Sequence, residues 1–143
     1  MTEQTVRTAT VTDPAADIAA VRAGFEAVAN RDLAAFADLF LPDATWNHRN
    51  DDRLGGIHHG SDGIVAFLAE SMELTAGTLR PVAETLMADG RGCVVALMRV
   101  SGTRPDGRTF DDPQVLVFTL DGGRVRSVDQ YIGDHAAVTA FWA

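Results

Sequence analysis

Several features that would point to particular functions are scarce or absent in this sequence. Its single cysteine, Cys93, excludes an internal disulfide and a cysteine-based zinc cluster, and the apolar residues around it predict an inert, buried thiol. No apolar run approaches the roughly 18 residues of a membrane helix, and residues 1–12 lack the apolar segment of a signal peptide. We therefore expect a cytoplasmic protein that has no membrane partner.

Basic residues are in the minority. The chain has 12 Lys and Arg residues against 20 Asp and Glu residues, which gives a net charge of −8, and the basic residues are scattered singly. Because nucleic-acid backbones are negative, this balance argues against nucleic acid as a partner. No phosphate-binding loop or nucleotide fingerprint is present, and no serine lies in a GxSxG setting, so the sequence predicts no cofactor and no serine-hydrolase triad.

What is present is the pattern of one α+β domain. The 143 residues suffice for a single core, and we expect a flexible leader over residues 1–12 followed by one domain over residues 13–143. Apolar residues at helical spacing predict three helices in the first half of that domain. Their predicted N-caps are Asp13, Asp32 and Ser61, and their predicted ends lie near Asn30, Pro42 and Gly77.

The second half has the period of two that is typical of strands. A short strand is expected at residues 44–48, and longer strands are expected over residues 80–88, 91–103, 109–120 and 124–132. Short turns between the long strands favour antiparallel pairing. The two middle strands are apolar on both faces, so we expect helices on one face and a second copy of the protein on the other.

Residues 45–60, TWNHRNDDRLGGIHHG, hold three of the four histidines and raise the question of a metal site. Catalytic zinc often takes three histidine ligands. However, the segment contains three glycines, and the neighbouring side chains of His58 and His59 diverge in any extended backbone. We therefore predict no metal site, and Asp51, Asp52 and Arg53 are interpreted as the solvated tip of a loop.

The chain resembles SnoaL-like and ketosteroid isomerase-like proteins of the nuclear transport factor 2-like superfamily. The resemblance rests on AVANRDLAAFADLFLPDATW, HGSDGIVAFLAESM, GRTFDDPQVLVFTLDGGRVRSVDQYIGD and the closing AAVTAFWA, which is of the kind seen in actinobacterial members. It implies a cone-shaped α+β barrel in which three N-terminal helices pack on a curved, mainly antiparallel sheet. It also implies a deep apolar pocket between helices and sheet, and commonly a homodimer across the outer sheet face.

His48 is the main catalytic candidate. It ends the first predicted strand two residues after Trp46, so both side chains share one face. The resemblance places DATWNH where ketosteroid isomerases carry the segment with their proton-shuttling carboxylate, and an imidazole suits proton transfer near neutral pH. The alternative role is to cap the strand end or to satisfy a loop carbonyl. The same resemblance places Leu116 and Phe25 where isomerases carry an acid and a tyrosine, which argues against a standard steroid isomerase.

Three further polar residues are candidates for the catalytic set. Arg99 is an unusual charge in a central strand, and it is explained either by an ion pair with Asp112 or by a clamp on a substrate carboxylate or enolate. On the last strand we favour Gln130 facing inward, with Asp129 and Tyr131 facing outward or lying at a dimer seam. The predicted substrate-binding residues are Phe25, Trp46, Phe67, Leu116, Phe118 and Val128.

Two functions remain open from the sequence. The first is a cofactor-independent acid/base enzyme of isomerase, cyclase, dehydratase or hydrolase type, in which His48 moves a proton and Arg99 or Gln130 polarises an oxygen. The second is a non-catalytic protein that binds a small apolar ligand in the same pocket. Two or more polar groups that converge around His48 would favour the enzyme.

Overall fold

The computed structural model describes residues 11–143, and four helices lie within that range: α1 (Pro14–Ala29), α2 (Leu33–Ala37), α3 (Gly60–Leu74) and α4 (His135–Trp142). Two of the predicted caps are confirmed, because Asp13 accepts a hydrogen bond from the Ala15 N–H at 3.0 Å and Asp32 accepts one from Ala35 N–H at 3.0 Å. The chain start, residues 1–10, lies outside the described part and includes most of the predicted leader.

Two helix predictions were wrong in detail, and one helix was not predicted. The second helix ends at Ala37, and residues 40–42, predicted to be helical, already belong to a strand. The third helix begins at Gly60 after His59, without a side-chain cap from Ser61. The C-terminal helix α4 was not predicted; Asp134 caps it by accepting a hydrogen bond from Ala137 N–H at 3.0 Å.

Six strands form one sheet. They are β1 (Phe40–His48), β2 (Gly56–His59), β3 (Arg80–Ala88), β4 (Cys93–Thr103), β5 (Thr109–Asp121) and β6 (Arg124–Tyr131), in the order β2-β1-β6-β5-β4-β3. Only the β1–β6 pair within this sheet is parallel, and the neighbours predicted to be antiparallel are so. The short strand β2 was not predicted. The parallel pair matters most, because it places His48 beside Gln130.

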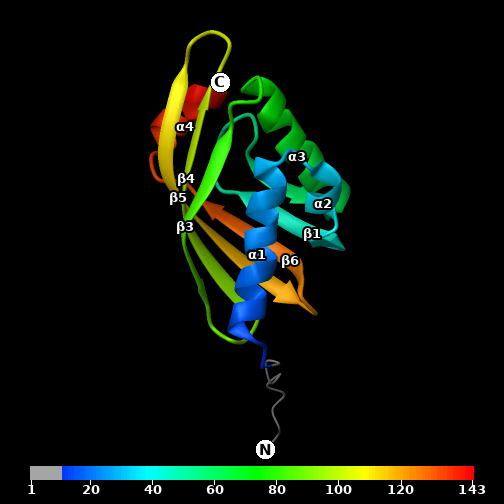
Figure 1. The fold of residues 1–143 in the computed structure, drawn as a ribbon. Helices are drawn as coiled ribbons and strands as arrows, with labels where there is room; N and C mark the ends of the chain where they lie inside the picture. The colour runs from blue at the N-terminus through cyan, green and yellow to red at the C-terminus, as the bar shows by residue number, and fades with distance from the viewer. Residues whose placement is uncertain (1–10) are drawn as a thin grey trace, which may run out of the picture.

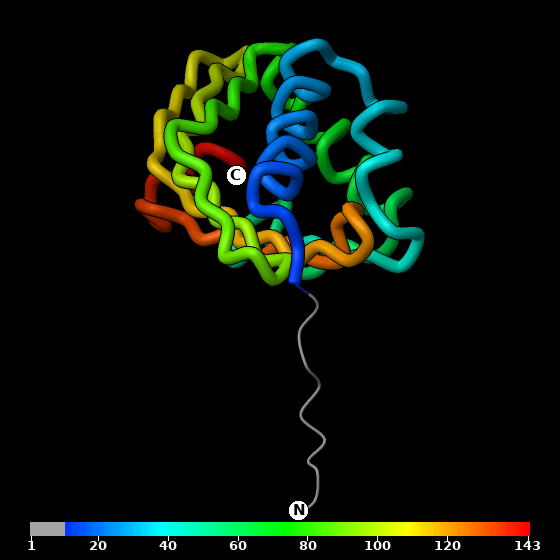
Figure 2. The backbone as a smooth tube through the Cα atoms, turned by 60° about the horizontal axis from the view of Figure 1, so that its bottom comes forward, coloured from blue at the N-terminus to red at the C-terminus, as the bar shows by residue number. Residues whose placement is uncertain are grey.

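The sheet is strongly curved and partly encloses α1. Register shifts interrupt β1, β3 and the β5–β6 pairing, and such bulges bend and twist the strands that contain them. Figure 1 shows α1 lying across the concave side of the sheet, with α2 and α3 next to β1, and Figure 2 shows the backbone as a ring around the interior. The prediction of an α+β fold with a curved, mainly antiparallel sheet is confirmed.

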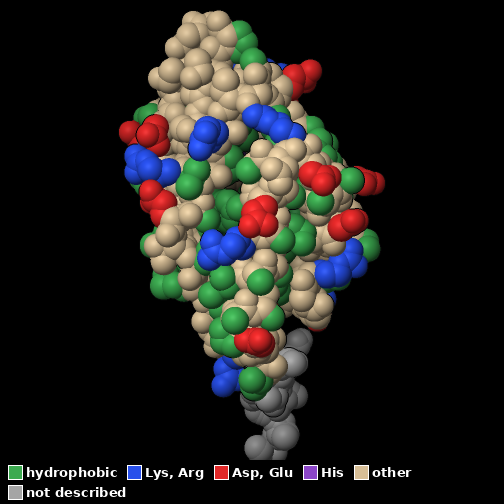
Figure 3. Space-filling view, in the orientation of Figure 1, with side chains coloured by type: hydrophobic (Ala, Val, Ile, Leu, Met, Phe, Trp, Pro, Cys, Tyr) green, Lys and Arg blue, Asp and Glu red, His purple; other side chains and the backbone are tan. Residues whose placement is uncertain are grey.

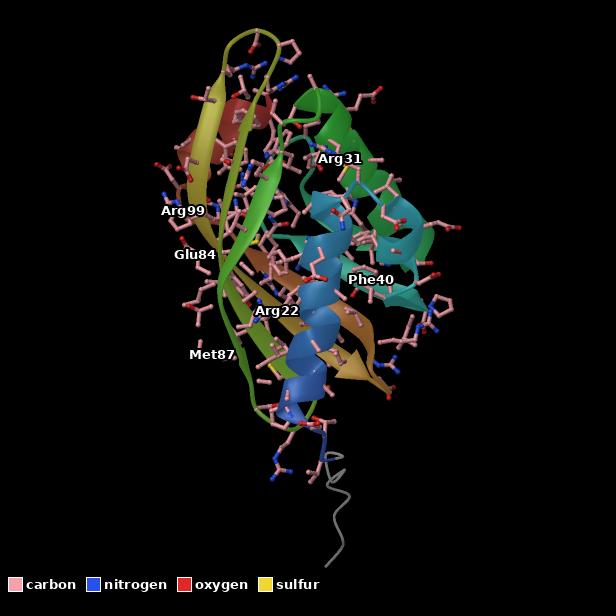
Figure 4. All side chains as sticks on the ribbon, viewed as in Figure 1. Arg22, Arg31, Phe40, Glu84, Met87 and Arg99 are labelled. Carbon is pink, nitrogen blue, oxygen red and sulfur yellow. The ribbon has the colours of Figure 1, made fainter. Side chains whose placement is uncertain are left out.

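Strand alternation separates the two faces of the sheet. Along β5 every second residue from Phe110 to Leu120 is buried, and this inward set includes Gln114 and Leu116. Figure 4 shows Glu84, Met87 and Arg99 on the opposite side of the sheet, away from α1. Side chains that could act in an interior site therefore come from the inward set.

Candidate functional site

An interior cavity of about 90 Å³ lies between the helices and the concave face of the sheet. This is several times the roughly 10–15 Å³ that a cavity needs, on this measure, to hold one water molecule. Its walls are mostly apolar and come from α1, α2, α3 and the inward residues of the strands. Figure 3 shows hydrophobic side chains reaching the surface along the seam between α1 and β3, with single charged side chains among them.

Most of the predicted site residues meet in this cavity. Those that line it are Phe25, Trp46, His48, Phe67, Leu116, Phe118 and Gln130. Val128, predicted to contact substrate, is only 1% exposed but is not part of the lining. It lies between Trp46 and Phe118 in the strand register, so it supports the wall from within the core.

His48 lies at the end of β1 with both ring nitrogens in hydrogen bonds to side chains. Its Nδ1 lies 3.0 Å from Oε1 of Gln130, and its Nε2 lies 2.9 Å from Oδ2 of Asp52. The His48 side chain is 3% exposed and that of Asp52 is 1% exposed. The alternative in which His48 merely satisfies a loop carbonyl is therefore wrong, because its partners are an amide and a buried carboxylate.

The indole of Trp46 fixes which way the Gln130 amide points. Trp46 Nε1 can only donate, and it donates to Gln130 Oε1 at 2.9 Å. The amide nitrogen of Gln130 consequently faces away and donates to Gln114 Oε1 at 2.7 Å, while Gln114 Nε2 donates to Asp112 Oδ2 at 3.0 Å. The hydrogen bonds that link Trp46, Gln130, Gln114 and Asp112 therefore all run the same way, and each residue donates to the next.

The orientation of the Gln130 amide determines which ring nitrogens of His48 carry a proton. Its Nδ1 faces Gln130 Oε1, which can only accept, so Nδ1 must carry a proton. Its Nε2 faces a carboxylate oxygen of Asp52, which also accepts when it is ionised. The arrangement therefore favours either an imidazolium that donates from both nitrogens to Gln130 and Asp52, or a neutral ring that accepts from a protonated Asp52.

Asp52 is held as a carboxylate. Burial by itself raises its pKa, but hydrogen bonds from His48 and Asn50, the charge of His48 and the Leu54 N–H outweigh burial and leave the pKa below its usual value. Asn50 Nδ2 donates to Oδ2 at 2.6 Å, and Leu54 N–H donates to Oδ1 at 2.7 Å. Of the two forms allowed above, the imidazolium paired with an ionised Asp52 is thus the favoured one.

The interpretation of Asp52 as part of a solvated loop tip was wrong. Leu54, two residues further on, is only 2% exposed and inserts among the cavity walls, which draws the loop inward and buries Asp52 against His48. A buried apolar residue in a polar, glycine-containing segment was the feature of the sequence that could have indicated this. Asp51 and Arg53 are exposed or largely so, as predicted.

Arg99 and Asp112 do not form the predicted pair and do not line the cavity. Arg99 Nε donates to Asp111 Oδ1 at 2.9 Å on the outer face, where both side chains are largely exposed. Strand alternation puts the side chain of Asp112 on the inner face, where it is buried and accepts hydrogen bonds from Gly133 N–H at 3.0 Å and Asp134 N–H at 2.9 Å. Asp112 thus anchors the turn before α4 and orients Gln114, while Arg99 points away from the site.

The other two histidines of residues 45–60 do not join His48 around a metal. His58 Nε2 bonds to the Leu54 carbonyl at 2.8 Å, and its ring stacks on Phe67 with centroids 4.3 Å apart. His59 is exposed on β2. Over residues 11–143, no group of three or more His, Cys, Asp or Glu side chains has a metal-binding arrangement.

No helix within residues 11–143 is long and apolar enough to cross a membrane.

Comparison with known proteins gives consistent matches over most of the chain. The family model of the SnoaL-like domain matches residues 21–128. An uncharacterized protein of Mycobacterium tuberculosis is 31% identical over 128 residues, which cover 90% of this chain and 97% of that protein.

Two solved structures are also similar. The structure of Bal32a, from a soil-derived mobile gene cassette, has a TM-score of 0.87 and 26% identity and covers 91% of this chain and 98% of its own. The structure of TerC, co-crystallised with polyporic acid, has a TM-score of 0.77 and 25% identity and covers 88% of this chain and 97% of its own.

Proposed function

The chain belongs to the SnoaL-like domain family, and from this premise we propose that it is an enzyme that uses cofactor-independent acid/base chemistry on a small hydrophobic substrate. The reaction belongs to the isomerase, cyclase, dehydratase or hydrolase type. The observation that carries the proposal is the buried His48–Asp52 pair at the wall of an apolar cavity, with the amide of Gln130 at the other ring nitrogen.

The pair divides the work between the two ring nitrogens of His48. Asp52 holds Nε2–H and fixes the orientation of the ring, so Nδ1 is the nitrogen that exchanges a proton with substrate. In the acid direction Nδ1–H passes to a substrate oxygen or carbon, and the ring becomes neutral while Nε2–H continues to donate to Asp52. In the base direction the neutral ring takes the proton back at Nδ1. A buried carboxylate beside the ring stabilises the charged form in both directions.

A second candidate function is ligand binding without chemistry. Of the residues that line the cavity within the described part of the chain, only His48 carries a titratable side chain. Neither Arg99 nor Asp112, which were predicted to assist it, lies on the cavity wall. TerC, which was co-crystallised with polyporic acid, supports a small organic ligand for the cavity under either function.

We also propose that the protein is a homodimer formed across the outer face of the sheet. Large hydrophobic side chains on β3, β4 and β6 are exposed there, namely Val82 at 45%, Met87 at 50%, Leu97 at 38% and Tyr131 at 45%. Cross-strand neighbours bring Met87 next to Val95 and Leu97 next to Val115, which makes the apolar surface continuous. Analytical ultracentrifugation of wild type and Leu97→Asp tests the dimer, since a buried aspartate at this position would favour the monomer.

The catalytic proposal is tested with a panel of planar hydrophobic ketones and phenols. Proton NMR in D₂O follows deuterium incorporation and rearrangement of each compound with wild type, His48→Ala, Asp52→Asn and the surface control His59→Ala. We expect turnover to be lost in His48→Ala and to fall by roughly 10²–10⁴-fold in Asp52→Asn, because the carboxylate no longer fixes the ring. His59→Ala should match wild type.

Two results would decide against catalysis. If panel compounds bind to wild type and are recovered unchanged, and His48→Ala binds them equally well, ligand binding replaces catalysis as the proposed function. Turnover that survives His48→Ala would instead remove His48 from the mechanism.

A further inference from the structure

Two ring N–H groups converge on one oxygen at the wall of the cavity. Trp46 Nε1 lies 2.9 Å from Gln130 Oε1, and His48 Nδ1 lies 3.0 Å from the same atom. Both distances are ordinary for hydrogen bonds from N–H to oxygen. Trp46, His48 and Gln130 all line the cavity, so this oxygen position adjoins the space available to a ligand.

The donors are better suited to an anionic oxygen than to an amide. The indole and imidazole rings are fixed by packing, since Trp46 and His48 both lie against Phe67, with ring centroids 5.6 Å and 5.7 Å apart. Rigid donors that point at one position stabilise charge without reorganisation, and a cationic donor strengthens the interaction. Gln130, by contrast, is a flexible side chain, and an amide oxygen carries only a partial charge.

We propose that Trp46 and His48 form a binding site for one substrate oxygen, and that Gln130 Oε1 occupies this site as an internal placeholder until substrate displaces it. The occupant is the oxygen of a ketone that becomes an enolate, or of a phenolate. Gln130 keeps an alternative partner when it is displaced, because its amide nitrogen already bonds to Gln114. This inference rests on the proposed function for the direction of proton transfer, and it adds the chemical class of the substrate.

The placeholder also explains why the resting ring is protonated at Nδ1. An amide oxygen at this position excludes the tautomer whose bare nitrogen would face it. The proton that His48 needs for the acid direction is therefore already directed at the place that the substrate oxygen takes. Gln130 is a positioning residue, and Trp46 is a binding residue for the reacting oxygen.

The test uses para-nitrophenol, whose visible absorption reports ionisation of its oxygen, and para-nitroanisole as a probe of the same shape that cannot become an anion. Gln130→Ala empties the oxygen position, and Gln130→Leu fills the same space without an oxygen. We expect Gln130→Ala to bind the phenolate at least about tenfold more tightly than wild type, since a hydrogen bond to a charged group is worth that much or more. Gln130→Leu should show no gain.

A second measurement uses the wild type and does not depend on how the Gln130 variants fold. The chain has two tryptophans, so the indole N–H signal that disappears in Trp46→Phe belongs to Trp46. Addition of para-nitrophenol should shift this signal downfield as the anion replaces the amide, and para-nitroanisole should not.

A third measurement combines two substitutions. Trp46→Phe in the Gln130→Ala background should abolish the gain in phenolate affinity.

Equal gains for the phenolate and for para-nitroanisole in Gln130→Ala would overturn the proposal, because they would report only added space. An unmoved Trp46 signal while the phenolate binds would also overturn it. These readouts are binding measurements, so they are separate from catalysis. If the phenolate binds as expected but no ketone is turned over, the oxygen site stands and the proposed enzymatic function fails.

Discussion

Replacement of Asp52 by asparagine tests the proton arrangement of the site most directly. Asparagine has nearly the same shape as aspartate but replaces Oδ2 by an N–H donor. Placed against His48 Nε2, this donor requires a bare nitrogen on the ring, while Gln130 still requires a proton on Nδ1. Asp52→Asn should therefore change His48 from an imidazolium into a neutral ring with its proton on Nδ1.

The cost in stability follows from the bonds of the carboxylate. Asp52 accepts from His48 Nε2, Asn50 Nδ2 and Leu54 N–H at 2.9, 2.6 and 2.7 Å. Asparagine keeps the bond from Leu54 and one bond to the ring, but it sets its own donor against Asn50. A lost hydrogen bond costs about 1 kcal/mol and a lost charge-assisted one about 1.5–3 kcal/mol, so we expect Asp52→Asn to lower the free energy of unfolding by about 2–4 kcal/mol.

Alanine at the same position should lower the free energy of unfolding further than asparagine does. Asp52→Ala leaves His48 Nε2–H and Leu54 N–H without their acceptors and the imidazolium without its counter-charge, while Asn50 keeps its bond to Thr139. Breaking a buried pair from one side typically costs about 3–5 kcal/mol. The assay is urea unfolding of wild type and both variants at neutral pH, together with ¹⁵N chemical shifts of the His48 ring. Wild type should show two protonated ring nitrogens, and Asp52→Asn should show one.

Either of two results would refute this reasoning. A loss of stability below about 0.5 kcal/mol in Asp52→Asn would match an exposed surface substitution and not a buried pair. Identical ¹⁵N shifts in wild type and Asp52→Asn would mean that Asp52 does not determine the protonation of His48.

Further predictions concern acid and two of the sequence candidates. Because the pKa of Asp52 is lowered in the folded protein, its contribution to stability is present at neutral pH and is lost as the pH falls through the folded value, so the difference in urea midpoint between wild type and Asp52→Asn should shrink in acid. Arg99→Ala removes an exposed pair with Asp111 and should change stability by less than about 1 kcal/mol and ligand affinity not at all, by urea titration and calorimetry. Asp112→Ala removes the acceptor of the Gly133 and Asp134 N–H groups and of the buried Gln114 amide, and at about 1 kcal/mol for each lost hydrogen bond it should cost about 3 kcal/mol, whereas Asp112→Asn should cost less.

The parts of the fold that could be predicted are those with a strong local period. The helix that begins after Asp13 and the four hairpin-linked strands from Arg80 onward have regular apolar spacing and clear turn residues, and the structure has them at nearly the predicted bounds. Residues 40–42 misled the prediction because Phe40 continues the helical spacing of α2. Tertiary pairing of Phe40 with Val125 on β6 outweighs that local preference.

The site also contains residues that the local pattern placed and residues whose positions depend on the tertiary fold. Strand alternation correctly grouped Trp46 with His48 and turned Gln130 inward, because a period of two determines which face a side chain occupies. It did not identify Asp52, whose position depends on how a loop folds back, and the sequence analysis wrongly named Asp112 as the partner of Arg99 where the structure has Asp111. That choice depends on which face each of two adjacent residues occupies, and a shift of one residue exchanges them.

The chemistry of the cavity depends on how its side-chain amides are oriented more than on the number of its charged groups. An aspartate in contact with the cavity would have supplied a base at once, but the described lining has no Asp or Glu. Here the only titratable group on the described cavity wall is His48, and its protons are determined by one neighbour that must accept at Nδ1 and one that holds Nε2. Because Trp46 fixes the Gln130 amide from one end and Asp112 fixes it through Gln114 from the other, substitution of residues that carry no titratable group should change the protonation of the one that does. Trp46→Phe alone should leave the ¹⁵N shifts of His48 as in wild type, whereas Trp46→Phe combined with Gln114→Leu releases the amide to rotate, and the shifts should then show a mixture of ring forms.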